Sequence, residues 1–164
     1  MELICKRKAF SLHDKWKALD QDGNVVFRSK KKHFLGPTKF KIITNGSGER
    51  IYFLKTKYVS GIRHHVYILD KNKDALCAVS LARVSRTENM LRVDEGSDLI
   101  SVKPISRFEF EIYLKGELCG TFTQQFGFLH SPYSLNIVQE KYAGLVFTVA
   151  MAIDSLFDKA KDRN

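Results

Sequence analysis

The chain has 164 residues, of which 44% are hydrophobic and 12% aromatic; this length can bury the core of one domain, and this composition argues against a disordered chain. The formal net charge is +9, and all of the excess lies in residues 1–65, which hold 15 Lys and Arg against 5 Asp and Glu. The three cysteines, an odd number without a C-x-x-C pair, argue against a disulfide framework and favour the reducing cytosol.

The first part of the chain repeats one unit three times. The units begin with apolar alternating strands at Trp16, Phe40 and Val66, so they are spaced by 24 and then 26 residues. These first strands end at Asp20, Thr44 and Asp70. In each unit a polar turn and a second apolar strand follow; Asp and Asn bond their own backbone in such turns, and Gly supplies a positive φ. The repeat predicts a meander of β-hairpins.

Residues 108–138 carry the clearest strand patterns. In FEFEIYL (108–114) the even-numbered residues, all apolar, face one way, and the odd-numbered residues face the other. A tight turn at Lys115 and Gly116 precedes ELCGTFTQQF (117–126), and YSLNIV (133–138) alternates again. With the hairpins of the first part, the candidate strands number roughly a dozen, a pattern typical of an all-β sandwich or barrel.

After Val138 the period changes, and residues 140–159 are predicted to form a helix. Its apolar stretch runs from Tyr142 to Ile153, twelve residues interrupted only by Gly144 and Thr148. At 1.5 Å per residue this stretch covers about 18 Å, whereas the hydrocarbon core of a bilayer is about 30 Å thick. The length therefore favours a buried core helix over a membrane span.

A helix that is apolar on every side must be enclosed, and the strands provide the enclosure. A barrel of about a dozen strands has a lumen too wide for side chains alone to fill, and a helix about 10 Å across fits it. We therefore predict one all-β domain over residues 1–164, a closed antiparallel barrel of about twelve strands around the C-terminal helix. The alternative fold is a smaller pleckstrin-homology-like sandwich, in which the helix would be amphipathic.

The segments WKALDQDGNVVFRSKKK, FKIITNGSGERIYFLKTK, VYILDKNKDALCAVSLAR, FEIYLKGELCGTF and YAGLVFTVAMAIDSL, in this order, resemble those of the LURP-one-related proteins. That family belongs to the tubby-like superfamily, which also includes the phospholipid scramblases. The resemblance spans essentially the whole chain and implies a closed barrel of twelve strands around a central helix.

The resemblance implies less about activity. Tubby domains bind phosphoinositide headgroups through basic residues, but no position of that site can be matched in this chain, and none is carried over. Scramblases have a cysteine-rich palmitoylated stretch and a calcium-binding segment near the C-terminal helix. This sequence shows neither, because its cysteines are scattered and Ser131-Pro132-Tyr133 leads straight into the last strand pattern. Scramblase activity is therefore not expected.

The densest basic run provides the candidate binding residues. Together with basic residues further along, the candidate anionic-lipid site consists of Arg28, Lys30, Lys31, Lys32, Lys55, Lys57 and Arg63. Lys6, Arg7 and Lys8 could extend it. Each basic group near an acidic membrane contributes about 1 kcal/mol. The alternative is that the lysine run only keeps an edge or loop soluble, because alternate strand residues point to opposite faces.

Nucleic acid is not the expected partner. Single-strand binders need exposed aromatic side chains among basic ones. The aromatic residues among these lysines are Phe34, Phe40, Tyr52, Phe53 and Tyr58. The alternation predicts that most of them face the core.

The sequence predicts no catalytic residue, metal or cofactor. His64 and His65 are adjacent on a predicted strand, so their imidazoles point apart and do not readily share one ion. Cys77 and Cys119 lie among apolar neighbours and are interpreted as small core residues, although a Cys–His nucleophile pair, which meets only in space, stays open. No G-x-S-x-G, P-loop or H-E-x-x-H motif occurs in the sequence.

We therefore expect a non-enzymatic cytoplasmic domain that binds anionic membrane lipids, including phosphoinositides, at the membrane surface without spanning the bilayer. The cytoplasmic assignment also rests on the start of the sequence, MELICKRKAF, which lacks the apolar region of a signal peptide. One alternative is a ligand-binding protein or enzyme with a concave surface cleft. Another is a protein-interaction scaffold, for which the sequence holds no discriminating feature.

Overall fold

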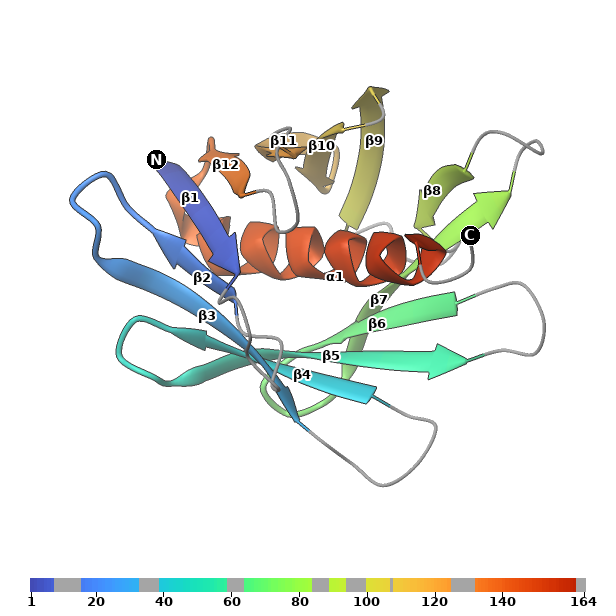
Figure 1. The fold of residues 1–164 in the computed structure, drawn as a ribbon, viewed down its shortest axis with the longest axis horizontal. Coiled ribbons are helices and arrows are strands. Elements are labelled where there is room, and N and C mark those ends of the chain that lie inside the picture. Colours follow the sequence, from blue (N-terminus) through green and yellow to red (C-terminus); the bar gives the residue numbers. More distant parts are fainter. Residues whose placement is uncertain are drawn as a thin grey trace.

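A computed structural model describes residues 1–7, 16–32, 39–58, 64–83, 89–93, 100–106, 108–124 and 132–161 (Figure 1). The strands are β1 (Glu2–Arg7), β2 (Trp16–Leu19), β3 (Val25–Lys32), β4 (Lys39–Asn45), β5 (Arg50–Tyr58), β6 (His64–Leu69), β7 (Ala75–Arg83), β8 (Asn89–Val93), β9 (Ile100–Ser106), β10 (Glu109–Leu114), β11 (Glu117–Gln124) and β12 (Tyr133–Ile137). A 3-10 helix, η1 (Glu140–Tyr142), leads into the α-helix α1 (Ala143–Lys161).

All twelve strands form one antiparallel sheet in the order β8-β7-β6-β5-β4-β3-β2-β1-β12-β11-β10-β9. Apart from β8 and β9, strands that are consecutive in the chain are neighbours, and the pairing of β1 with β12 joins the two halves of the chain. The end strands β8 and β9 approach to within 8 Å between Cα atoms, although no ladder joins them in the described residues. The sheet is thus a nearly closed barrel, which confirms the predicted fold class.

The three repeated hairpins close in the same way. Asp20, Asn45 and Asp70 each donate the backbone N–H to the carbonyl oxygen of the residue four positions ahead, at 2.9–3.0 Å. Each also accepts the N–H of that same residue on Oδ1, at 2.8–2.9 Å. A side chain that bonds its own backbone in this way stabilises a turn.

The turns correct one detail of the predicted repeat. The position equivalent to Asp20 and Asp70 is Asn45 and not Thr44, because Thr44 still pairs with Arg50 in the ladder. The true spacing is therefore 25 residues in both intervals. The third residue after each of these positions has a positive φ. In two units this residue is a glycine, Gly23 or Gly48, and in the third it is Lys73, with a φ of 71°.

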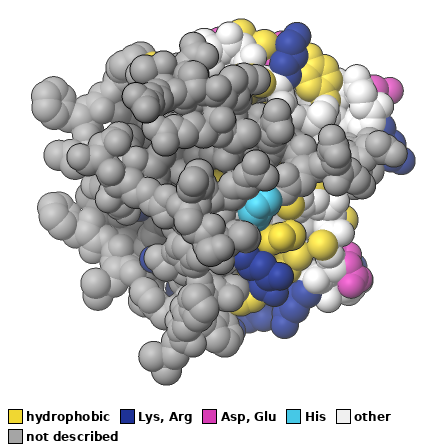
Figure 2. Space-filling view, turned by 90° about the vertical axis from the view of Figure 1, so that its right-hand side faces the viewer, with side chains coloured by type: hydrophobic (Ala, Val, Ile, Leu, Met, Phe, Trp, Pro, Cys, Tyr) yellow, Lys and Arg dark blue, Asp and Glu magenta, His cyan; other side chains and the backbone are white. Residues whose placement is uncertain are grey.

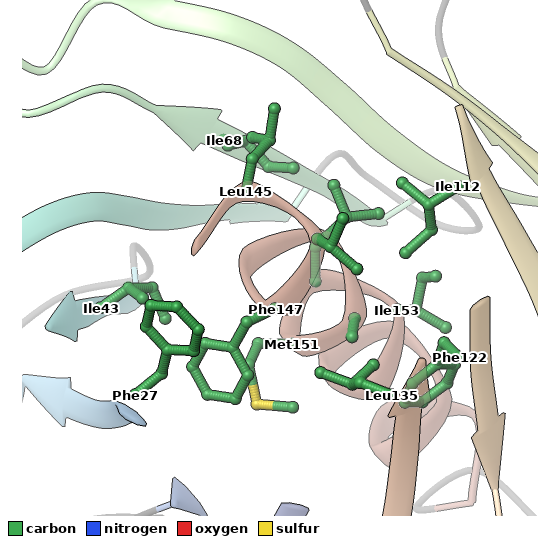
Figure 3. Close-up of a cluster of buried hydrophobic side chains, with 14 of the residues drawn as sticks. Phe27, Ile43, Ile68, Ile112, Phe122, Leu135, Leu145, Phe147, Met151 and Ile153 are labelled. Carbon is green, nitrogen blue, oxygen red and sulfur yellow. The ribbon is translucent and has the colours of Figure 1, made fainter. Parts of the chain in front are cut away.

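Helix α1 fills the lumen of the barrel (Figure 1). It contacts strands from both halves of the sheet, namely β3, β5, β6, β7, β11 and β12. No residue from Val146 to Leu156 is more than 8% exposed. Phe147 stacks on Phe27 with ring centroids 5.4 Å apart, in the buried cluster shown in Figure 3. The burial on all sides confirms the interpretation of this segment as the core.

The length and apolarity of the helix also bear on membranes. In the described part of the chain, no helix has both the length and the hydropathy that a bilayer crossing requires.

Two glycines allow the helix and the sheet to approach closely. A Cβ added at Gly144 would lie 2.9 Å from Cδ1 of Ile51. A Cβ added at Gly120, on β11, would lie 2.8 Å from the backbone oxygen of Asn136 and 2.9 Å from Cγ1 of Val146. Both distances are shorter than real Cβ contacts, so these positions require glycine unless the neighbours move.

The lumen also holds polar groups, and those of the helix make defined interactions. Thr148 and Ser155 donate their hydroxyls to the carbonyl oxygens of the residues four positions earlier, at 2.6 and 2.7 Å. Asp154, which is 1% exposed, accepts a hydrogen bond from the hydroxyl of Tyr133. Its Oδ2 atom also lies 3.8 Å from Nζ of Lys41. A buried carboxylate therefore links α1 to β12 and β4.

Candidate functional site

The candidate site lies on the outer wall of the barrel, and strand alternation divides the predicted basic run. On β3 the side chains of Phe27 and Ser29 are buried, so Lys31 lies on the inner side with them, next to Lys41 across the ladder. Arg28, Lys30 and Lys32 have the opposite parity and lie on the outer face. Lys31 is therefore separated from the other candidates of the run.

One row of paired residues crosses five strands and carries a basic side chain on four of them. From β1 to β5 the paired residues in this row are Lys6, Lys17, Arg28, Thr44 and Arg50. Paired residues on one face of a sheet have Cβ atoms about 5 Å apart, so these groups form a continuous basic band. Sequence reasoning did not include Lys17 and Arg50, because only the ladder register places them beside Arg28.

A surface groove of about 430 Å³ lies over this band. It is lined by Trp16, Lys17, Arg28, Ser29, Lys30, Ile42, Thr44 and Arg50. Arg28 donates from its guanidinium to the carbonyl oxygens of Gly46 and Asn45, at 2.8 and 3.4 Å. It therefore fixes the 45–49 turn beside the groove while its charge stays at the groove wall.

A second part of the same outer face combines lysines with aromatic rings. Another cross-strand row runs from β3 to β6, and its paired residues are Lys32, Phe40, Lys55 and Tyr67. Nζ of Lys55 lies 5.7 Å from the ring centroid of Phe40. Lys57 pairs with His65 on the next row. We call the following five residues the aromatic half of the wall: Phe40, Lys55, Lys57, His65 and Tyr67.

The described aromatic residues of this group take three different positions. Tyr52 packs against the core from the inner side. Phe53 lies on the opposite side of the strand in a row with Ile42 and Leu69, where it is only 9% exposed, and Phe40 is half-buried on the outer face. The side chain of Tyr58 and all of residue 34 lie outside the described residues.

Acidic residues are almost missing from the strands of this wall. Strands β1 to β6 contain one acidic residue, Glu2. The other acids in this half of the described chain lie in the hairpin turns: Asp20, Asp22, Glu49, Asp70 and Asp74. The described part of the face in Figure 2 shows Lys and Arg side chains beside hydrophobic ones and a histidine, with Asp or Glu side chains toward its right-hand edge. The positive charge of the wall is thus not balanced along its strands.

Four basic residues of the predicted lipid site remain. Two of them lie outside the described residues, and the other two lie on opposite faces of β1. Arg63 and Lys8 lie outside the described residues. Lys6 is exposed on the outer face of β1, whereas Arg7 lies on the inner side, with Cζ 5.9 Å from the ring centroid of Trp16. The placed candidates on the outer face are therefore Lys6, Arg28, Lys30, Lys32, Lys55 and Lys57.

The cysteines contribute to the core. Cys5, Cys77 and Cys119 are all buried, which confirms the interpretation of the last two as core residues. Burial raises the pKa of the Cys77 thiol to about 12, and burial, with the charge of Asp154 as a smaller cause, raises the pKa of Cys5. Thiols with raised pKa values are poor nucleophiles. In the described residues, no group of three His, Cys, Asp or Glu side chains is arranged to hold a metal ion.

Comparison with known proteins gives one match. The family model of the LURP-one-related proteins matches residues 1–154. No curated protein and no solved structure gives a significant match.

Proposed function

The chain belongs to the LURP-one-related family, and from this premise we propose that it is a non-enzymatic domain that binds anionic phospholipids, including phosphoinositides, at the cytoplasmic surface of a membrane. The observation that carries the proposal is the convergence of basic side chains on one outer wall. These residues are Lys17, Arg28, Lys30, Lys32, Arg50, Lys55 and Lys57. Strands β1 to β6 together contribute a single acid, Glu2 on β1.

The strength of such binding follows from the number of charges. Each basic residue near an anionic leaflet contributes about 1 kcal/mol, so four to seven of them give about 4 to 7 kcal/mol. This corresponds to dissociation constants from about 1 mM to about 10 µM. Because the groups are at the surface, the attraction weakens as salt shortens the Debye length to a few ångströms.

The non-enzymatic assignment is supported by the contents of the barrel and the groove. Helix α1 occupies the lumen, where a barrel would otherwise hold a small ligand. Four of the eight described residues that line the groove are cationic, so its chemistry favours an anion over the apolar ligand of a typical small-molecule site. The buried thiols have raised pKa values, which does not favour nucleophilic catalysis.

Co-sedimentation with vesicles tests the proposal. The protein should pellet with phosphatidylcholine vesicles that contain phosphatidylserine or phosphatidylinositol bisphosphate, and the bound fraction should fall as salt rises. The double variant Lys30→Gln/Lys32→Gln should bind more weakly, because it removes two outward charges. Lys31→Gln is the matched control from the same run, and its inner position predicts unchanged binding. Absence of sedimentation with both anionic vesicles at low salt would refute the proposal.

A further inference from the structure

We propose that the aromatic half of the basic wall enters the boundary between lipid headgroups and acyl chains, so that an apolar contact adds to the attraction of charges. This inference rests on the proposed function and specifies how the face meets the membrane. It concerns Phe40 and Tyr67 as the inserting rings and Lys55 and Lys57 as the groups that remain at the phosphates.

The geometry of this region differs from that of a simple basic patch. Phe40, Lys55 and Tyr67 are consecutive members of one cross-strand row, and both rings are half-buried. Nζ of Lys57 lies 5.4 Å from the centroid of the Tyr67 ring. The wall therefore places a lysine ammonium group close to each of the two rings.

This combination has a specific chemistry at a lipid surface. Lysine buries its aliphatic stem along apolar surface while its ammonium group stays among polar groups. Tyrosine has an apolar ring and a polar tip, and it is enriched where a protein meets the headgroup region. In the adjacent row, Phe53 and Leu69 are only 9% and 7% exposed, so the accessible aromatic surface of this region is that of Phe40 and Tyr67. The region thus combines apolar ring and stem surface with ammonium groups that can bind lipid phosphates.

The same residues fit single-stranded nucleic acid less well. Base stacking requires an accessible ring face, but cations and a second ring already lie at these faces. Lys55 occupies a position over Phe40. Tyr67 has Lys57 over its ring and the His65 ring stacked at 6.2 Å between centroids. A lipid surface needs only the ring edges and the lysine stems, which makes it the favoured partner.

The groove half of the wall provides a contrast within the same molecule. It carries Lys17, Arg28, Lys30 and Arg50, and the only aromatic residue in its lining, Trp16, is 2% exposed. It has charge without an accessible ring. The two halves should therefore respond differently to salt and to removal of aromatic side chains.

A fluorescent probe at the aromatic half tests the insertion. His65→Cys and, as a control on the far wall, Ser101→Cys are each labelled with a polarity-sensitive fluorophore at neutral pH, where the buried native thiols react slowly. With phosphatidylserine vesicles, the label at residue 65 should shift to the blue and be quenched by lipids brominated near the headgroup. The label at residue 101, exposed on β9, should do neither. Inositol hexakisphosphate, a soluble anion, should not produce the shift.

The outcomes separate the inference from the proposed function. If the protein sediments with the vesicles and both labels remain in water, the contact is purely electrostatic and the inference is wrong while the proposed function stands. If nothing sediments, both are wrong. If the label at residue 65 responds to polyuridylate but not to vesicles, the wall binds nucleic acid instead.

A second measurement uses salt to separate the two contributions. The variant Phe40→Ala/Tyr67→Ala, first checked for a native circular dichroism spectrum, should bind about tenfold more weakly at every salt concentration with an unchanged salt dependence. Lys30→Gln/Lys32→Gln should instead reduce the salt dependence. Equal affinity of the aromatic variant and the wild type would overturn the inference. If the variant does not fold, the conservative Tyr67→Phe, which should retain most of the binding, and the label at residue 65 decide the question.

Discussion

Replacing Asp154 by Ala should destabilise the protein strongly, because this carboxylate is the charged group that joins the central helix to the barrel wall. Asp154 is 1% exposed. It accepts a hydrogen bond from Tyr133, and the Lys41 ammonium lies 3.8 Å away with a side chain that is only 12% exposed. The substitution removes a hydrogen-bond acceptor of the Tyr133 hydroxyl and the counter-charge of the Lys41 ammonium, whereas the hydroxyl and the ammonium themselves remain.

The size of the effect follows from the kind of interaction. Breaking a buried ion pair by removing one partner costs about 3–5 kcal/mol, and a buried donor that loses its acceptor costs about 1–3 kcal/mol. Because both effects come from one carboxylate they overlap, and we expect a loss of about 4 kcal/mol. A domain typically has about 5–15 kcal/mol of stability in total, so the variant should be close to unfolding.

Urea denaturation followed by circular dichroism measures the loss. The informative comparison is Asp154→Leu/Lys41→Met, in which both charges are replaced by apolar groups of similar size; such replacements are often neutral or stabilising. The double variant should therefore be more stable than Asp154→Ala. A loss below about 1 kcal/mol for Asp154→Ala would mean that the carboxylate is effectively solvated and that the inferred link between helix and wall is wrong.

Three further predictions concern the plug, the turns and the thiols. Val149→Asp and Ala150→Asp each place an unpaired charge at a position that is 0% exposed and should prevent soluble folding; a normally folded variant would disprove the enclosed helix. Lys73→Gly should raise the free energy of unfolding by up to about 1 kcal/mol because it relieves a φ of 71°, whereas Gly23→Ala should lower it by a similar amount. Burial raises the pKa of Cys77 from 9.0 to about 12, so between these pH values the thiol keeps its proton in the folded protein and loses it on unfolding. The free energy of unfolding should therefore fall as pH rises from 9 to 12, and it should fall less steeply in Cys77→Ala than in the wild type.

Local patterns were sufficient to predict the architecture. The alternation in residues 108–114 placed Phe110, Ile112 and Leu114 inside, where they are buried. The apolar length of the helix and the number of strands together indicated a filled barrel. These features depend on period and composition, which a sequence displays directly.

The candidate site depended on register, which the sequence does not display. Alternation alone predicts that the side chain of Lys31 points to the opposite face from those of Lys30 and Lys32. Which of the two faces is the lumen side follows from the burial of Phe27, which has the same parity as Lys31. Lys17 and Arg50 lie far from Lys30 in sequence, and they reach the same groove only through the ladders of β2 to β5. The partners of Asp154 come from β4 and β12, and no local signal relates these strands to the helix.

The two walls of the barrel differ in charge, and this difference gives the molecule a preferred orientation. On β10 the buried Phe110 and Ile112 alternate with Glu109 and Glu111, and Lys103 of β9 lies 4.0 Å from Glu111, so both signs of charge occur on this wall. The excess of positive charge on the strands β1 to β6 makes the charge distribution asymmetric, and asymmetry of this kind steers an approaching particle before contact. An anionic surface would attract the basic wall most strongly. Since the central helix already supplies the apolar core, Phe40 and Tyr67 on the outer face are not needed to fill the lumen, and the proposed contact with a lipid surface would account for their position among the lysines.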